Sequence, residues 1–316
     1  MSKAGERVWL AAVRRLAVTL PVLWLVVTVV FLLIHLVPGD PIVQMLGEGA
    51  TAADVSTLRH AYGLDLPLHV QYGRYISGVA RGNFGQSLRL RDSVGHLVAQ
   101  RYPFTLSLAF AALGLGIVLA VPAGVWAATN RDQWQDRAVG VVSLVGLSFP
   151  NFALGPLLIL GFSIGLGWLP VSGSGTGWAF LTHLILPALT LGLGMAAILT
   201  RMVRTAMLEE LGQDYIRTAR AKGLSEHVVV YRHALRNALI PVLTVVGLQF
   251  GSLLAGAIVT ETIFSLPGIG RLTLSAISNR DYALVQGCIL AIGLTYVAVN
   301  LLTDLAYVAV NPRMRG

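Results

Sequence analysis

Residues 104–128 read FTLSLAFAALGLGIVLAVPAGVWAA, a stretch without a single charged side chain. A helix gains about 1.5 Å per residue, so about 20 apolar residues cross the hydrocarbon core of a bilayer. The stretch is long enough for that crossing, and its glycines and Pro122 are tolerated in membrane helices. It therefore predicts a transmembrane α-helix.

Five further apolar runs are long enough to cross in the same way: 16–37, 138–166, 183–203, 237–261 and 284–310. Of the 316 residues, 55% are hydrophobic and only 12% are charged, against roughly 25% charged residues in a typical soluble domain. A soluble fold of this length has too little interior to bury so much apolar surface. We therefore expect an all-α, polytopic membrane protein with six transmembrane helices.

The distribution of lysine and arginine sets the expected orientation. With the N-terminus inside, 15 of the 23 basic residues lie in the cytoplasm, and the remaining 8 lie in outer segments of greater total length. Cytoplasmic loops carry such an excess, so we expect both termini inside. The same bias accounts for the net charge of +8 without any nucleic acid partner. The cytoplasmic segments are then 1–15, 129–137, 201–236 and 311–316, and the outer ones 38–103, 167–182 and 262–283.

The long segment 38–103 separates the first run from the second. It is mostly polar, and glycines and prolines punctuate it, but short amphipathic helices fit around 53–61 and 68–79. We expect a small ordered extracytoplasmic segment here. The chain then divides into 1–103, the first span with this segment, and 104–316, the core membrane domain.

Enzymatic motifs are missing from the sequence. The chain has only two lysines, Lys3 and Lys222, and neither follows a glycine-rich phosphate-binding loop. The single cysteine, Cys288, sits in an apolar run, and neither metal-ligand spacing nor a catalytic constellation stands out. We therefore expect a permease that binds no cofactor or metal of its own and does not hydrolyse ATP alone.

The loop 201–236, between the fourth and fifth runs, is the most informative segment. Residues 209–225 read EELGQDYIRTARAKGLS. We predict a short helix capped by Asp214, a turn at Gly223, and a second amphipathic helix that leads into the fifth run. The first helix is basic and slim, which suits entry into a groove on a partner. An ordinary positive-inside loop would carry the same charge.

Several motifs resemble those of bacterial ABC importer permeases, specifically the dipeptide, oligopeptide and nickel group of binding-protein-dependent permeases. The loop carries YIRTARAKG (215–223) and RNALIP (236–241). Residues 214–216 read DYI where many importers have Glu-Ala-Ala, a variant that is usual in this group. The resemblance covers essentially the whole chain, since further matches follow in order: LVPGDP (36–41), YGLDLP (62–67), SFPNF (148–152), ETIFSLPGIGR (261–271) and NPR (311–313).

The resemblance implies a type I ABC importer permease fold in the bacterial cytoplasmic (inner) membrane. Two homologous permeases would form one pathway above two ATP-binding subunits, which bind ATP and Mg. A solute-binding protein would deliver cargo to the outer segments, which act as its docking and gating surface. Such a permease moves cargo when ATP closes its ATPase pair, and the loop transmits that motion to the spans.

The resemblance and the polar residues of the spans also give candidate sites. The coupling loop would comprise Asp214, Tyr215, Ile216, Arg217, Thr218, Ala219, Arg220, Ala221, Lys222 and Gly223. The polar candidates for lining the pathway are Ser148, Asn151, Thr190 and Gln249. The candidates for the outer gate and docking surface are Asp40, Glu261 and Arg271.

The cargo stays open at this point. Peptides or peptide-like molecules such as glutathione are one reading, and nickel or a metal chelate is the alternative within the same family. An ion-coupled secondary transporter is the alternative of another class, but it predicts inverted repeats and several buried charges that the sequence does not show. Whether the two permeases are different or identical chains is also open.

Overall fold

A computed structural model describes residues 3–36, 42–43, 51–61, 63–87 and 89–310. They form two compact units, which we describe separately. Unit 1 is built on Leu106–Leu266, and unit 2 combines Ala17–Thr105 with Pro267–Val297. Three long helices contribute to both units: α1 (Lys3–Leu36), α5 (Val94–Thr129) and α13 (Tyr282–Val310).

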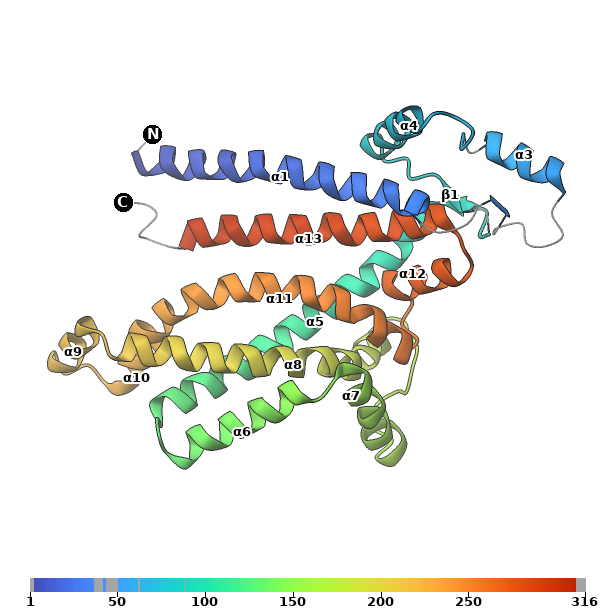
Figure 1. Ribbon diagram of the computed structural model, residues 1–316. Helices are drawn as coiled ribbons and strands as arrows, with labels where there is room; N and C mark the ends of the chain where they lie inside the picture. The colour runs from blue at the N-terminus through green and yellow to red at the C-terminus, as the bar shows by residue number, and fades with distance from the viewer. Residues whose placement is uncertain (1–2, 37–41, 44–50, 62, 88, 311–316) are drawn as a thin grey trace. The chain divides into compact units, whose positions relative to one another are not determined.

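Unit 1 is a helical bundle in which α8 packs against α6, α7 and α11 (Figure 1). The packed face of α8 repeats every fourth residue, because Leu191, Met195, Leu199 and Val203 are all buried in the core cluster. The elements that unit 1 adds are α6 (Trp134–Ser148), α7 (Asn151–Leu158), the π-helix η1 (Ile159–Gly165), α8 (Trp178–Leu211), α9 (Asp214–Ala221), α10 (Glu226–Val228), the π-helix η2 (Val229–Ala234) and α11 (Leu235–Ile263).

The third predicted run, 138–166, is not one straight span. The segment Trp134–Ser148 meets Asn151–Gly165 at a bend of 102°. Pro150 causes the break, because its ring disfavours a helical conformation at the residue before it, and Phe149 is accordingly extended with ψ 117°. Backbone groups stay paired on each side of the bend, since the N–H of Phe149 donates to the carbonyl of Val145 at 3.3 Å and the N–H of Leu154 donates to that of Pro150 at 3.1 Å.

Unit 2 contains the two short helices that the sequence predicts, α3 (Ala52–Ala61) and α4 (Leu68–Ala80), together with α12 (Ile269–Ser278). A two-stranded antiparallel sheet, β1 (Gln86–Ser87) with β2 (Asp92–Ser93), was not expected from the sequence. The hairpin is fixed to the start of α13, because the buried hydroxyl of Ser87 donates a short hydrogen bond to the buried carboxylate of Asp281.

Within the described residues, four helices are long and apolar enough to cross a membrane, and the bent pair raises the number to five. The four single helices are Val94–Thr129, Trp178–Leu211, Glu226–Ile263 and Tyr282–Ala306. The first predicted run corresponds to α1, in which Ala17–Leu32 forms a shorter apolar helix. The expectation of several helices that could span a membrane is therefore confirmed, while the number six stays a proposal.

Exposed tryptophans occur at two levels of unit 1. Trp126 and Trp134 meet edge to face at 6.1 Å, and Trp178 is 87% exposed at the start of α8. Because Gly124 of α5 packs on Val203 of α8, the two levels are separated by about 25 residues of helix, or about 38 Å. That distance matches a bilayer with its interfacial regions, where tryptophan is enriched.

Helices α5 and α8 approach each other closely at glycines. A methyl group on Gly192 of α8 would lie 2.8 Å from the carbonyl oxygen of Ala112 on α5. Small residues permit such close backbone approach between membrane helices, where dispersion contacts rather than hydrophobic exclusion hold the bundle together.

Replacing Gly192 by alanine is expected to destabilise unit 1 by about 1–3 kcal/mol, because the added methyl group meets backbone that cannot turn aside. Gly140→Ala is the matched control, since a methyl group there meets nothing within 4 Å and alanine is favoured over glycine in helices. The apparent Tm of the purified protein in detergent measures both effects. Equal melting of Gly192→Ala and wild type would contradict the close α5–α8 contact.

Candidate functional site

The short helix α9 lies at one end of α8 and is held there by its apolar face (Figure 1). Ile216 is fully buried and Ala219 is 7% exposed, and both belong to the core cluster that includes Met207 of α8 and Val230 of η2. Burying one such isoleucine contributes about 1.5–3 kcal/mol. The i, i+3 spacing puts both residues on one side of the helix and leaves its polar side outward.

The N-terminus of α9 differs from the expected cap. The capping position is Gln213, which makes no side-chain cap bond, so Asp214 is the first helical residue and not the cap. Its carboxylate pairs instead with Arg217 at 3.4 Å on the exposed surface. A negative charge in the first turn still favours the helix through its dipole.

The C-terminus of α9 ends as the sequence predicts. Gly223 has φ +77°, a left-handed conformation that glycine adopts without a steric cost. Its N–H donates to the carbonyl of Arg220 at 2.9 Å, and the N–H of Leu224 donates to that of Ala219 at 3.4 Å. This pair of bonds is the Schellman motif, which stops the helix and turns the chain toward α10.

Tyr215 ties α9 to the helices on both sides of the loop. Its hydroxyl donates a short hydrogen bond to the carboxylate of Glu210 at the end of α8. The same oxygen accepts a bond of 3.0 Å from the side-chain amide of Asn237 in α11. Partial burial and the neighbouring Glu210 raise the pKa of Tyr215, so the phenol stays a donor at neutral pH. Movement of α9 is thereby linked to both α8 and α11.

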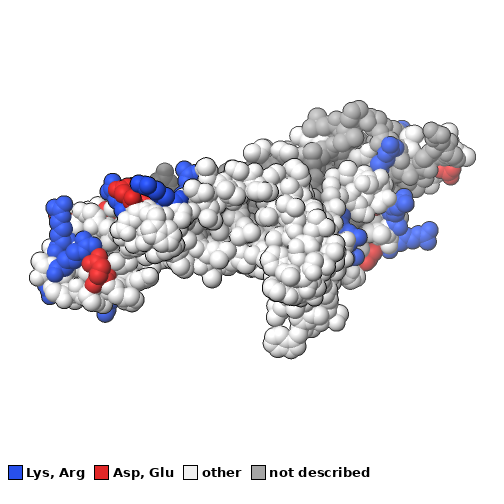
Figure 2. Space-filling model, turned by 90° about the horizontal axis from the view of Figure 1, so that it is seen from below, with Lys and Arg blue, Asp and Glu red and all other residues white. Residues whose placement is uncertain are grey.

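The outward side of α9 is polar and mostly basic. The side chain of Arg217 is 75% exposed, and Lys222 is exposed at the last turn. Arg220 forms a two-pronged ion pair with Glu226 of α10, at 2.7 and 3.1 Å, which fixes the direction of the turn. Figure 2 shows charged side chains gathered at the end of unit 1 where Figure 1 places α9. The helix thus offers a charged surface on an apolar anchor.

The structure brings two of the polar pathway candidates to neighbouring positions. Asn151 begins α7, and its side-chain amide packs on Gly194 of α8 and Gly256 of α11. A methyl group added to either glycine would lie 3.8 Å or 3.7 Å, respectively, from that amide. Thr190 lies one turn before Gly194, fully buried, and its hydroxyl donates to the carbonyl of Leu186 at 2.8 Å.

The other two pathway candidates lie on α6 and α11. Ser148 ends α6, is exposed, and donates to the carbonyl of Leu144 at 2.9 Å. Gln249 is a half-buried residue of α11.

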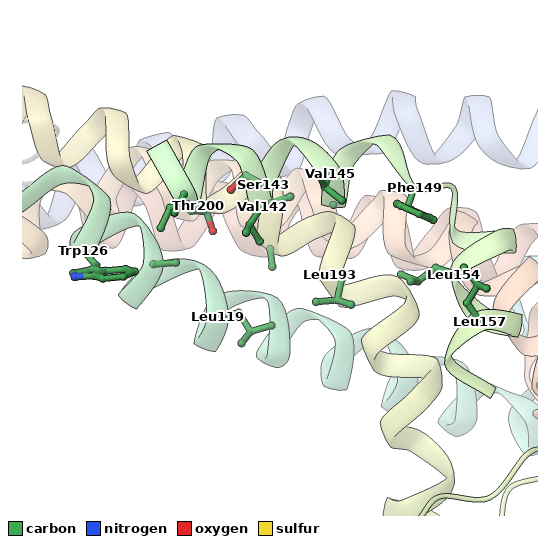
Figure 3. Close-up of a pocket in the computed structure, with 16 residues that line it drawn as sticks. Leu119, Trp126, Val142, Ser143, Val145, Phe149, Leu154, Leu157, Leu193 and Thr200 are labelled. Carbon is green, nitrogen blue, oxygen red and sulfur yellow. The ribbon is translucent and has the colours of Figure 1, made fainter. Parts of the chain in front are cut away.

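An apolar pocket of about 670 Å³ lies beside the bend, between α5, α6, α7 and α8. Figure 3 shows the side chains of Leu119, Val142 and Leu193 around it. Ser143 and Thr200 are the polar side chains among its lining residues. Such a lining suits hydrocarbon or an apolar helix better than a charged cargo.

The structure describes two of the three outer-gate candidates, one in each unit. Asp40 lies outside the described residues. Glu261 is fully buried near the end of α11 in unit 1, and Arg271 is exposed on α12 of unit 2.

An ion pair that the sequence did not predict joins α6 to α8. Arg204 donates from Nε and Nη2 to the carboxylate of Asp136 at 2.5 and 2.7 Å, and the backbone N–H of Asp132 adds a bond of 3.1 Å. The carboxylate side chain is only 9% exposed. The available signal was one acidic residue just before an apolar run and one arginine just after another, which is too little to predict that they pair.

Several long apolar helices, with a small amphipathic helix docked on the end of the bundle, define a multi-pass membrane protein. The chain belongs to the binding-protein-dependent transport system inner membrane components, whose family description matches residues 120–316, while the N-terminal description of the same systems matches residues 10–109. It is thus an ABC importer permease of the peptide group in the inner membrane, as the resemblance implied.

Relatives of known name support this assignment over nearly the full length. The glutathione transport system permease protein GsiC of Salmonella paratyphi A is 44% identical over 302 residues, which cover 96% of this chain and 97% of that protein. The protein of the same name from Escherichia coli (strain K12) is 44% identical over 303 residues, covering 96% and 98%.

A solved structure shares the fold of part of the chain. The MetNI methionine ABC transporter in an inward-facing conformation aligns with a TM-score of 0.56 at 19% identity, over 68% of this chain and 96% of that chain. This likeness shows a shared fold over the aligned part of the chain.

Tyr215→Phe is expected to loosen α9 by about 1 kcal/mol, because it removes the bonds to Glu210 and Asn237 while keeping the ring. Amide hydrogen exchange of Asp214–Ala221 should therefore accelerate. Tyr231→Phe is the matched control, since Tyr231 is 50% exposed and stacks only its ring on His227 at 4.7 Å. Unchanged exchange in Tyr215→Phe would show that the hydroxyl does not hold the helix.

Proposed function

We propose that this permease imports peptide-like cargo such as glutathione and that α9 is its coupling helix. The cargo proposal is supported by the names of relatives that are 44% identical over nearly the whole chain. The coupling proposal is supported by one observation above all: α9 is anchored by Ile216 and tied through Tyr215 to two membrane helices.

The proposed assembly contains a second homologous permease, two ATP-binding subunits and an extracytoplasmic solute-binding protein. The exposed basic side of α9 would sit in a groove of an ATP-binding subunit, where ATP and Mg are bound. Because α9 is linked to both α8 and α11, movement of the groove would shift both helices together. The importing and resting conformations would then be two states, and nucleotide binding would set their relative populations.

Six spans with both termini in the cytoplasm complete the proposal. In this arrangement α1 is the first span, α9 lies inside, and α3 and α4 lie outside in a segment that receives the binding protein. The division of the chain at residues 103 and 104 stays part of this proposal, as do Asp40, Glu261 and Arg271 as gate and docking residues. Ser148, Asn151, Thr190 and Gln249 are kept as pathway candidates.

The alternatives have less support. Nickel or a metal chelate would be carried by the same fold, but the named relatives given above are glutathione permeases. An ion-coupled secondary transporter would leave the family membership and the docked α9 unexplained.

Arg217→Glu is expected to leave the complex assembled but to lower cargo uptake per ATP hydrolysed severalfold, because it reverses an exposed charge on the proposed contact surface. Arg131→Glu is the matched control, since Arg131 is also exposed at 67% but lies outside α9. Uptake of labelled glutathione and ATP hydrolysis are measured together in proteoliposomes with the binding protein. Wild-type coupling in Arg217→Glu would overturn the role of α9, whereas ATP hydrolysis without glutathione uptake in the wild type would overturn the cargo.

Single cysteines test the orientation. A membrane-impermeant maleimide should label Ser56→Cys of α3 in intact cells, but Ser225→Cys only after permeabilisation, because both positions are exposed and the proposed topology puts them on opposite sides of the membrane. The wild type serves as the blank, since Cys288 is buried. Labelling of Ser225→Cys in intact cells would reverse the proposed topology.

A further inference from the structure

Unit 2 contains a cavity to which the proposed function assigns no role. It has a volume of about 310 Å³ and lies between the end of α1, helix α4, the turn before β1 and the start of α13. This volume is at the lower end of the range for small-molecule sites, which is roughly 300–1,000 Å³.

Aromatic side chains form the apolar part of the cavity. The rings of Phe31 and Tyr75 lie 5.6 Å apart and are tilted by 39°, and Phe84 and Tyr282 also line the space. Four aromatic residues from four segments of the chain thus enclose room for an apolar side chain or a flat group.

Polar side chains that are held by hydrogen bonds line another side of the cavity. The amide nitrogen of Gln71 donates to the carbonyl of Leu66 at 2.8 Å and to that of Leu64 at 3.3 Å. Its oxygen thereby faces Nε2 of His35, at 3.3 Å. Gln286 donates to the carbonyl of Val30 at 3.0 Å. These bonds hold the polar side chains in place before any ligand arrives.

Two groups remain available to a ligand. The guanidinium of Arg74 lines the cavity, and none of the described lining residues is acidic. The carboxylate of Asp65, which is not a lining residue, bonds to His60 at 2.7 Å, and its pKa is lowered first by that bond and also by the charge of Arg74.

The second group is the hydroxyl of Tyr75. It is buried and has no hydrogen-bond partner among the described residues. Burial raises the pKa of Tyr75 to about 12, so this hydroxyl remains a donor at neutral pH. A buried donor without an acceptor is costly, and a ligand oxygen would remove that cost.

We propose that this cavity binds a short peptide through its free carboxylate, with Arg74 holding the carboxylate, the Tyr75 hydroxyl donating to a ligand oxygen, and the aromatic walls accepting an apolar side chain. The site goes beyond the proposed function, because passage of cargo through the membrane helices does not require a second peptide site in unit 2. It would let the permease sense free peptide on its own surface.

The test is equilibrium dialysis of labelled alanyl-phenylalanine against the full chain, purified in detergent with the subunits that accompany it and without the binding protein or ATP. Saturable binding is expected, and the C-terminal amide of the same dipeptide should bind at least about tenfold more weakly, because it lacks the charge that Arg74 recognises. Equal binding of acid and amide, or no binding of either, would overturn the proposal.

Variants locate the binding. Arg74→Gln should weaken it at least about tenfold, and Arg81→Gln is the matched control, because Arg81 is an exposed residue just after α4 that does not line the cavity. Ala283→Leu should also weaken binding by filling the cavity without removing a polar group. Wild-type affinity in both Arg74→Gln and Ala283→Leu would place the peptide elsewhere.

A third outcome would show that the ligand of the cavity is a side chain of another protein and not a free peptide. If alanyl-phenylalanine does not bind, but Arg74→Gln weakens capture of the binding protein, the cavity receives an acidic side chain of that protein and the proposal is wrong. None of these measurements depends on transport, so they can fail while the proposed import function stands, and the reverse also holds.

Discussion

The hydrocarbon of a bilayer offers no hydrogen-bond partners, so every backbone N–H and C=O at that depth must be satisfied within the protein. The long helices of this permease meet that requirement, and the side chains they turn outward are apolar, with Val142 71% and Val118 70% exposed. Where Pro150 interrupts the third run, the chain bends by 102° and pairs backbone groups on each side of the break. The same constraint explains why glycines such as Gly192 carry the closest helix contacts, since packing and not exclusion from water holds these helices together.

The short helix α9 is stabilised differently from the long apolar helices, because it depends on contacts with its neighbours. It is only eight residues long, too short to be stable as an isolated helix, so burial of Ile216 and the bonds of Tyr215 must hold it in place. A helix stabilised by the membrane bundle, with its polar side free, moves when the bundle moves. The ion pair of Asp136 with Arg204 stiffens α6 against α8 in the same unit. In the proposed mechanism, coupling therefore depends on contacts that are local in space but join segments far apart in sequence.

Much of this arrangement could be predicted from the sequence. The apolar runs predict membrane helices because their length is set by the bilayer, and Gly223 predicts the turn after α9 because few residues adopt its positive φ. The bend in the third run was missed, although Pro150 was visible, because the mean hydropathy of a run is the same whether its helix is continuous or broken. Asp214 was expected to cap α9, but the cap falls one residue earlier. The Asp136–Arg204 pair and the cavity of unit 2 could not be predicted, since they depend on which distant segments meet.

Native mass spectrometry of the complex extracted from its own membrane tests the account most directly, because the central claim is that this chain works as one permease of an ATP-driven pair. The account predicts a particle that contains this chain, a second permease and two ATP-binding subunits, and that keeps this composition when α9 is intact. A chain that is extracted without ATP-binding subunits, and that transports cargo on an ion gradient alone, would contradict it.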